Sequence, residues 1–194
     1  MSQDNIEIEA HFIDVDTNLV KKKLMDLGAE DLGEDTLREI IFYDRELTWN
    51  KHKRFLRMRK NKNFTILSFK DFQYEDKNDL PNNEPVVKEI EITVDSWHQA
   101  KLLLEAVGLV AFREQEKVRH SYRLGDVLVD IDHWPSIPPY VEIEGPSREK
   151  IQHVAEKLGF EWEKAIFRGA GYIIEHYYHI PVTQLRSFTF DKIG

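Results

Sequence analysis

Apolar and charged residues alternate in three short stretches of the chain. The pattern EIE occurs at residues 7–9, 89–91 and 142–144, within IEIEAHF, VVKEIEITV and YVEIEG. A period of two is typical of a β-strand, so the glutamates of each stretch point to one face and the isoleucines to the other. The pattern therefore predicts three strands, each with an acidic face and an apolar face.

A helix signal follows each of these strands. The predicted helices lie at residues 14–28, 95–108 and 146–159. Their N-cap candidates are Asp16 or Thr17, Asp95 or Ser96, and Ser147, and each stretch ends at a glycine (Gly28, Gly108 and Gly159). Their apolar positions are Leu19, Val20, Leu24 and Leu27, then Leu102, Leu103 and Val107, then Ile151, Val154 and Leu158. Caps, apolar stripes and terminal glycines are the expected start and stop signals, so a strand–helix unit is used three times.

Further strands are predicted between these units. They lie at residues 38–44, 54–60, 64–72, 112–124 and 126–134, with hairpins at 61–63 and at Gly125. The polar stretch 73–85 contains two prolines and predicts a long mobile loop, and residues 165–180 predict a short helix. The sum is an α+β fold of about eight mostly antiparallel strands with flanking helices, as a barrel or a strongly curved sheet. We expect one domain over residues 1–180 and a loose tail over 181–194.

Composition narrows the classes of protein. The chain has 194 residues, of which 41% are hydrophobic and 32% charged, which suits one globular domain. It contains no cysteine, so disulfides, zinc–thiolate sites and cysteine nucleophiles are excluded. A formal net charge of −8 argues against nonspecific binding to nucleic acid or to anionic membranes. With no long apolar run or signal peptide, a soluble cytoplasmic protein is expected.

Charged side chains gather on one face of several predicted strands. Arg57 and Arg59 share a face, Lys117 and Arg119 share another, and Asp132 alternates with apolar neighbours. If the sheet closes, these groups and the glutamates line its interior, where they must pair or bind ions. A polyanion carried on divalent cations suits such an interior. The alternative is an open sheet whose charged face is simply solvated.

The ordered set of motifs resembles one known family. IEIEAHF, LRMR, TILSFK, KEIEITV, EKVRHSYRL and VLVDIDHWPSIPPYVEIEGPS, in this order over about residues 5–178, look like the CYTH superfamily of triphosphate tunnel enzymes. That family includes class IV adenylyl cyclases, thiamine triphosphatases and inorganic tripolyphosphatases. The resemblance implies an eight-stranded antiparallel β-barrel, the triphosphate tunnel, that binds a triphosphate with Mg²⁺ or Mn²⁺.

The resemblance also implies roles for individual residues. The implied metal carboxylates are Glu7, Glu9, Asp132, Glu142 and Glu144, and the implied phosphate-binding cations are Arg57, Arg59, Lys70, Lys117 and Arg119. Glu89 is either a further carboxylate of the tunnel wall or a partner that orients an arginine. Lys117 and His11 are the implied catalytic residues.

His11 departs from the family pattern. The family motif reads E-x-E-x-K, and this chain has a histidine where the family has the lysine. Histidine can act as a general base near neutral pH or as an extra metal ligand. The change is equally compatible with a weakened activity, or with a histidine that has little role.

Three activities remain open at this point. A hydrolase would release phosphate from ATP, tripolyphosphate or thiamine triphosphate, whereas a cyclase would convert ATP to cyclic AMP and pyrophosphate. A noncatalytic triphosphate sensor is the third reading, and His11 is the feature that favours it. The retained charged residues favour an enzyme that acts on a triphosphate, with hydrolysis placed first. A homodimer is compatible with the sequence.

Overall fold

The computed structural model describes residues 6–74 and 86–194, and the chain divides into two compact units. Unit 1 comprises Met1–Ile6, Thr36–Glu116 and Val182–Gly194, and unit 2 comprises Glu7–Asp35 and Lys117–Pro181. The two longest strands, β3 (Glu30–Asp44) and β7 (Leu109–Leu124), run through both units. That residues 1–180 form one domain stays a prediction.

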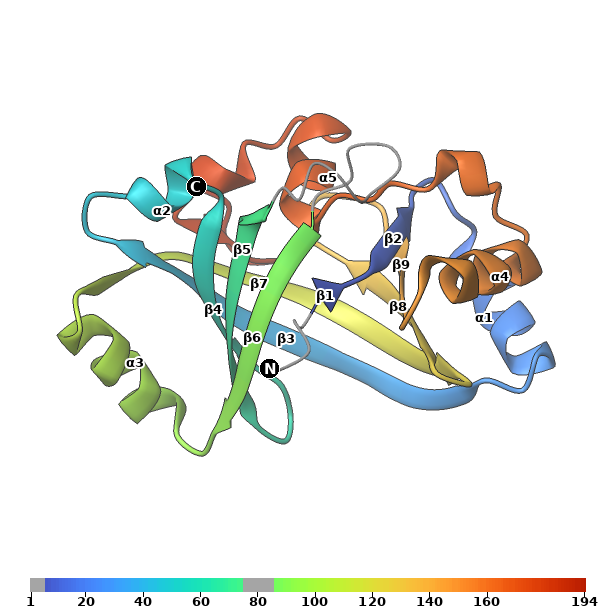
Figure 1. The fold of residues 1–194 in the computed structure, drawn as a ribbon, viewed down its shortest axis with the longest axis horizontal. Coiled ribbons are helices and arrows are strands. Elements are labelled where there is room, and N and C mark those ends of the chain that lie inside the picture. Colours follow the sequence, from blue (N-terminus) through green and yellow to red (C-terminus); the bar gives the residue numbers. More distant parts are fainter. Residues whose placement is uncertain (1–5, 75–85) are drawn as a thin grey trace. The chain divides into compact units, whose positions relative to one another are not determined.

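Unit 1 is built on an antiparallel sheet. Its elements are α2 (Thr48–Lys51), β4 (Arg54–Lys60), β5 (Thr65–Tyr74), β6 (Val86–Val94), α3 (Trp97–Ala106), the 3-10 helix η2 (Val182–Gln184) and β10 (Ser187–Phe188). The strand order is β6-β5-β4-β3-β7, and Figure 1 shows β4, β5 and β6 side by side. The strand β1 (Ile6–Glu7) lies at the boundary between the units.

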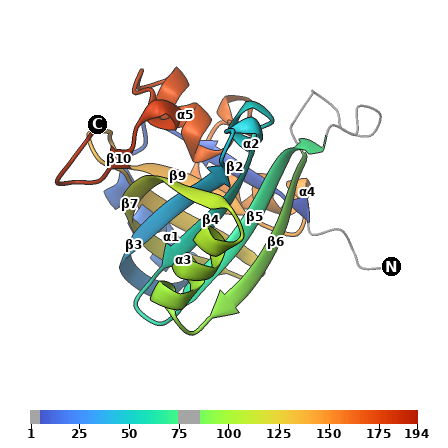
Figure 2. The ribbon, with the colours of Figure 1, turned by 90° about the vertical axis from the view of Figure 1, so that its left-hand side faces the viewer.

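Helix α3 covers the apolar face of this sheet, as Figure 2 shows. Ala100 and Leu104 of α3 pack on a cluster formed by Ile40, Phe42, Met58 and Leu67. The predicted apolar stripe of this helix was wrong. Its residues Leu102, Leu103 and Val107 are 46%, 62% and 66% exposed. The small Ala100 side chain, one turn before Leu104, allows close approach to the sheet and sets which face is buried.

The second EIE stretch lies in β6 and differs from its prediction. Ile90 and Ile92 are 51% and 57% exposed, whereas Glu89 on the opposite face is buried. Alternation therefore sorted the side chains of β6 correctly into two faces. The expectation that a helix backs its isoleucines was wrong, because α3 packs over Ile40, Met58 and Leu67 instead.

Unit 2 carries the first and third EIE stretches. Its elements are β2 (Glu9–Phe12), α1 (Thr17–Asp26), β8 (Val127–His133), β9 (Tyr140–Glu144), α4 (Arg148–Leu158), the 3-10 helix η1 (Trp162–Lys164) and α5 (Ala170–His176). The strand order is β7-β8-β9-β2. Helices α1 and α4 lie side by side in Figure 1, and Lys23 Nζ of α1 donates to the carbonyl of Leu158 at 2.6 Å.

The core of unit 2 lies between these helices and one face of the sheet. Ala10, Phe12, Val129 and Ile143 of the strands are buried with Val20 and Leu24 of α1 and Ile151, Val154 and Leu158 of α4. The predicted stripe of α4 is confirmed, but Leu19 and Leu27 of α1 are 48% and 37% exposed. Burial of one face by the helices leaves the opposite face, which carries Glu142, for polar contacts.

The N-cap of α1 gives a test of the local signals. Asp16 caps this helix, and its Oδ1 accepts from the backbone N–H groups of Asn18 and Leu19 at 3.0 and 3.1 Å. We expect Asp16→Ala to lower the free energy of unfolding by about 1 kcal/mol, measured by urea denaturation. The control is Asp26→Ala in the last turn of α1, where only an exposed pair with Lys22 is lost. An effect of Asp26→Ala as large as that of Asp16→Ala would contradict the capping role.

Comparison with the predicted elements confirms the fold class. All eight predicted strands are present, with the first divided at Ile8 into β1 and β2, and the fold is α+β with a mostly antiparallel sheet and flanking helices. The predicted loop 73–85 lies outside the described residues, apart from 73–74, which belong to β5. The predicted tail is instead structured, since β10 pairs with β7 and Phe188 is fully buried. None of the helices in the described ranges is long and apolar enough to cross a membrane.

Candidate functional site

Strand register in unit 2 places charged residues opposite one another. His11 of β2 pairs with Glu142 of β9, and Glu142 pairs on its other side with Asp130 of β8. Asp132 of β8 pairs with Arg119 of β7. Because paired residues in antiparallel strands point to the same face, these side chains form rows on the face opposite the apolar core.

Arg119 is the centre of this group. Its Nε and Nη2 donate to Asp132 Oδ1 and Oδ2 at 2.6 and 2.7 Å. Its Nη2 also lies 2.9 Å from Glu142 Oε2, and its Nη1 contacts Asp130 Oδ2. Lys117 Nζ donates to Asp132 Oδ2 at 2.5 Å. We call Glu9, His11, Lys117, Arg119, Asp130, Asp132 and Glu142 the Arg119 cluster.

In the Arg119 cluster, burial and the neighbouring opposite charges shift the pKa values of the side chains in opposite directions. Burial alone would raise the pKa of the Glu142 carboxyl, but Arg119 and Lys117 hold it well below its ordinary value. The same balance lowers the pKa of Asp132. For Asp130, burial raises the pKa, and the opposing effect of Arg119 does not cancel it. Burial also opposes the charge of Arg119, yet three carboxylates raise its pKa well above the ordinary value.

His11 is fully buried beside these carboxylates. Its Nε2 lies 3.2 Å from Glu142 Oε2, and among the described residues its Nδ1 has no hydrogen-bond partner. Burial alone would lower the pKa of His11, but Glu9, Glu142 and Asp132 together raise it above 6.5. His11 is therefore an integral part of the Arg119 cluster.

Three of these residues can provide ligands to a metal ion. Glu9, His11 and Glu142 each offer a ligand atom, and these atoms lie within 4.8 Å of one another. Two carboxylates and one imidazole nitrogen are a donor set that fits a divalent cation.

The other predicted metal carboxylates lie differently. Both oxygens of Asp132 accept from Lys117 or Arg119, and the three-donor group found among the described residues includes neither Asp132 nor Glu144. Glu144 is half-buried and pairs in register with Glu9. The side chain of Glu7 lies outside the described part of the structure.

The remaining predicted phosphate ligands form a second group, in unit 1. Arg57 Nη2 lies 3.4 Å from Glu89 Oε1, and Lys70 Nζ lies 3.1 Å from Glu89 Oε2. Arg59 Nε donates to Glu39 Oε1 at 2.6 Å. We call Glu39, Arg57, Arg59, Lys70, Glu89 and Gln115 the Glu39 cluster. The contacts of Glu89 agree with the reading of this residue as a partner that orients an arginine.

Glu39 is a buried charged residue that sequence reasoning missed. It is 2% exposed, and its Oε2 accepts from Gln115 Nε2 at 2.5 Å. Gln115 in turn accepts from Arg113 Nε at 2.7 Å, and Arg113 Nη1 donates to the carbonyl of Val182 at 2.8 Å. Glu39 escaped notice because residues 40–43, which follow it, are apolar on both faces of the strand, so alternation gave no signal there.

Substitution of Glu39 tests this hydrogen-bond chain. We expect Glu39→Gln to lower the free energy of unfolding by about 1–3 kcal/mol, because the amide NH₂ meets a donor and a buried bond is left unmade. Urea denaturation measures the effect. The control is Glu114→Gln, since Glu114 is an exposed glutamate on β7 next to Gln115. Equal stability of the two variants would show that the Glu39 contacts are not stabilising.

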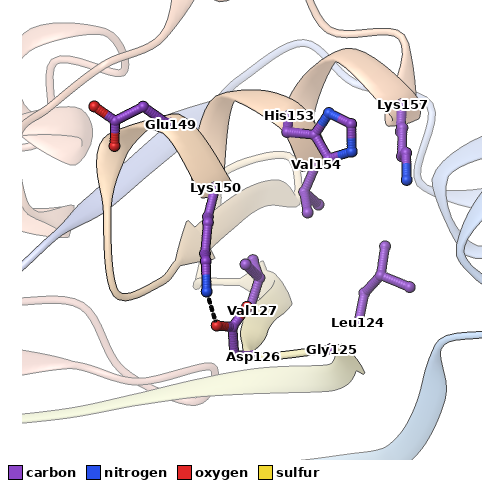
Figure 3. A pocket seen from close by; sticks show the side chains of 9 residues that line it. All are labelled: Leu124, Gly125, Asp126, Val127, Glu149, Lys150, His153, Val154 and Lys157. Carbon is purple, nitrogen blue, oxygen red and sulfur yellow. Dashed lines mark hydrogen bonds and ion pairs between the residues drawn. The ribbon is translucent and has the colours of Figure 1, made fainter.

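A shallow pocket of about 460 Å³ lies elsewhere in unit 2, between the turn that joins β7 to β8 and helix α4 (Figure 3). Its walls include Leu124, Val127 and Val154, and Lys150 at its edge is paired with Asp126. No predicted site residue is among the described side chains that line it. The Arg119 cluster therefore remains the candidate site.

Comparison with known proteins places this arrangement in a family. The family model for the CYTH domain matches residues 5–171, which include every residue of both clusters. The chain belongs to the CYTH family. No curated protein matches the sequence of this CYTH protein.

Solved structures share its fold. A candidate adenylate cyclase from Vibrio parahaemolyticus matches with a TM-score of 0.74 and 13% identity, over 89% of this chain and 99% of that one. The PH1012 protein from Pyrococcus horikoshii matches with a TM-score of 0.66 and 22% identity, over 84% and 96%. HpAC1 from Hippeastrum, a candidate adenylyl cyclase with a dominant triphosphatase activity, matches with a TM-score of 0.60 and 17% identity, over 90% and 95%. At these identities the likeness concerns the fold of the CYTH domain.

Proposed function

We propose that this CYTH protein is a divalent-metal-dependent triphosphatase. The observation that carries the proposal is the Arg119 cluster, in which the three donors Glu9, His11 and Glu142 lie beside the cationic side chains of Lys117 and Arg119. Carboxylates that bind a hard cation next to Arg and Lys are the parts that phosphoryl transfer requires. Mg²⁺ or Mn²⁺ is the expected cofactor, and the substrate is a small triphosphate.

The basic residues would bind and orient the phosphates. Arg119 and Lys117 are held in place by Asp132, so their positions are fixed before substrate arrives. A bound cation would supply further charge neutralisation and orient the attacking water.

Hydrolysis asks less of the protein than cyclisation does. The triphosphate and a water molecule are the only reactants, whereas a cyclase must also hold an adenosine with its 3′-hydroxyl directed at the α-phosphorus. The buried charged residues described above account for triphosphate binding alone. The dominant triphosphatase activity described for the Hippeastrum protein supports the same order of preference.

A product assay tests the proposal. Purified protein is incubated with Mg²⁺ or Mn²⁺ and with ATP, tripolyphosphate or thiamine triphosphate, and a chelator serves as the control. Orthophosphate release that the chelator abolishes is the expected result. Cyclic AMP with pyrophosphate would overturn the proposal in favour of a class IV adenylyl cyclase. Metal-dependent triphosphate binding without turnover would overturn it in favour of a sensor.

A further inference from the structure

We propose that His11 is a nitrogen ligand of the divalent cation and makes the site prefer Mn²⁺ to Mg²⁺. The inference rests on the proposed function, because it concerns the cation of that site. It goes beyond that function by assigning a role to the residue that replaces the lysine of the family motif.

The position of His11 is fixed by its backbone and by its neighbours. Its N–H donates to the carbonyl of Ile166 at 2.9 Å, and its carbonyl accepts from the N–H of Ile166 at 3.0 Å. The imidazole ring packs edge-on against Tyr140, with ring centroids 5.7 Å apart. A fully buried ring held in this way is preorganised as a ligand, because few rotamers remain to be lost on binding.

The two ring nitrogens have different surroundings. Nε2 is within hydrogen-bond distance of the Glu142 carboxylate, and Nδ1 is buried without a partner among the described residues. Two ligand atoms of one divalent cation can lie about 3 Å apart, because metal–ligand distances are about 2.1 Å, so Nε2 and Glu142 Oε2 can bind the same ion. A cation bound through Nε2 would replace the hydrogen bond between the ring and Glu142 and would leave the ring proton on Nδ1.

Histidine and lysine at this position also differ in the charge that they add to the donor group. A lysine beside Glu9 and Glu142 would add a permanent positive charge to the donor group, whereas a neutral imidazole adds none. The donor group with histidine therefore has a formal charge of −2, compared with −1 for lysine. The carboxylates that surround the ring attract a metal cation as they attract a proton. His11 thus provides a ligand atom and strengthens the attraction for the cation.

The identity of the donor atom predicts which metal is preferred. Mg²⁺ binds oxygen ligands almost exclusively, while imidazole nitrogen suits transition metals. Mn²⁺ accepts both carboxylate oxygen and imidazole nitrogen. We therefore expect this chain to bind Mn²⁺ with a lower dissociation constant than Mg²⁺. The Mg²⁺ dissociation constant divided by the Mn²⁺ dissociation constant should fall by about tenfold or more when the His11 imidazole is removed.

The experiment measures cation binding directly and needs no turnover. Pulsed electron paramagnetic resonance of the full chain loaded with Mn²⁺ detects a nitrogen hyperfine coupling when an imidazole is bound. Calorimetry gives the two dissociation constants. The variants are His11→Lys, which restores the family residue, and His11→Gln, with His153→Gln as the control because His153 is an exposed histidine of unit 2.

The expected result is a nitrogen coupling in the wild type and in His153→Gln, but not in either His11 variant. Tight Mn²⁺ binding without a nitrogen coupling in the wild type would overturn this inference and leave the proposed function intact. Loss of the coupling in His153→Gln would also overturn it. Absence of any Mn²⁺ or Mg²⁺ binding would overturn both. If one of the two His11 variants fails to fold, the other decides the matter.

Discussion

Replacement of Arg119 with alanine is expected to lower the free energy of unfolding by about 3–5 kcal/mol, since the change leaves buried carboxylates without their partner. Arg119 contacts Asp130, Asp132 and Glu142, whose side chains are 6%, 0% and 9% exposed. Lys117 Nζ pairs with Asp132, whereas the guanidinium of Arg119 contacts all three carboxylates. We expect the thermal midpoint to fall by roughly 10 °C, measured by circular dichroism.

The neighbouring arginine on β7 provides a matched control. Arg123 points to the same face of the strand, but its side chain is 52% exposed and its Nε lies 3.9 Å from Glu30 Oε2. We expect Arg123→Ala to change the free energy of unfolding by no more than about 0.5 kcal/mol, because exposed pairs contribute little. If Arg119→Ala were as stable as Arg123→Ala, the cluster would not depend on the guanidinium charge.

The loss of unfolding free energy caused by Arg119→Ala should become smaller at acidic pH. In the wild type the folded-state pKa of Glu142 is well below its ordinary value of 4.5. The stability that this shift contributes is complete above pH 4.5 and is lost as the pH falls through the folded-state pKa. Without Arg119 the largest cause of this lowered pKa is lost, and at acidic pH the protonated carboxyls no longer need a cation. The difference in unfolding free energy between the two proteins should therefore narrow from neutral to acidic pH.

Local signals in the sequence predicted the faces of the strands and most helix ends. The alternation in IEIEAHF separated the face of Glu9 from the apolar face of Ile8, and the Ser147 cap and Gly159 gave the limits of α4. These features depend on backbone geometry and on neighbours within one turn or one strand, so the sequence carries them directly. The family motifs added the roles expected of the charged residues.

Features that depend on contacts between residues far apart in the chain could not be predicted from the local sequence pattern. No local signal indicates that His11 pairs with Glu142, 131 residues away, or that Gln115 donates to Glu39. The same limit explains α3, where Leu102 and Leu103 were predicted as apolar positions, but Leu104 is the one of the three consecutive leucines that packs in the core. Strand register and helix docking are set by tertiary packing, which overrides local preference.

Loss of a single carboxylate from the donor group is expected to abolish most of the activity. We expect Glu142→Gln to reduce kcat/KM for tripolyphosphate by at least about 100-fold at a fixed metal concentration, because a ligand and a negative charge are removed together. Glu9→Gln should have a similar effect, since its ligand atom lies in the same three-donor group. The measurement is orthophosphate release across a range of Mn²⁺ concentrations.

Glu142→Gln should lose activity without a large loss of stability, unlike Arg119→Ala. Arg119 keeps Asp130 and Asp132 as partners when Glu142 is neutral, so Glu142→Gln should remain folded where Arg119→Ala is strongly destabilised. The control is Glu156→Gln on the surface of α4, where only a contact with Gln152 changes. A partial recovery of activity at high Mn²⁺ is expected if the loss lies in cation binding. Full activity of Glu142→Gln at low Mn²⁺ would place the cation outside the Arg119 cluster, because the Glu142 carboxylate would then not be needed for cation binding.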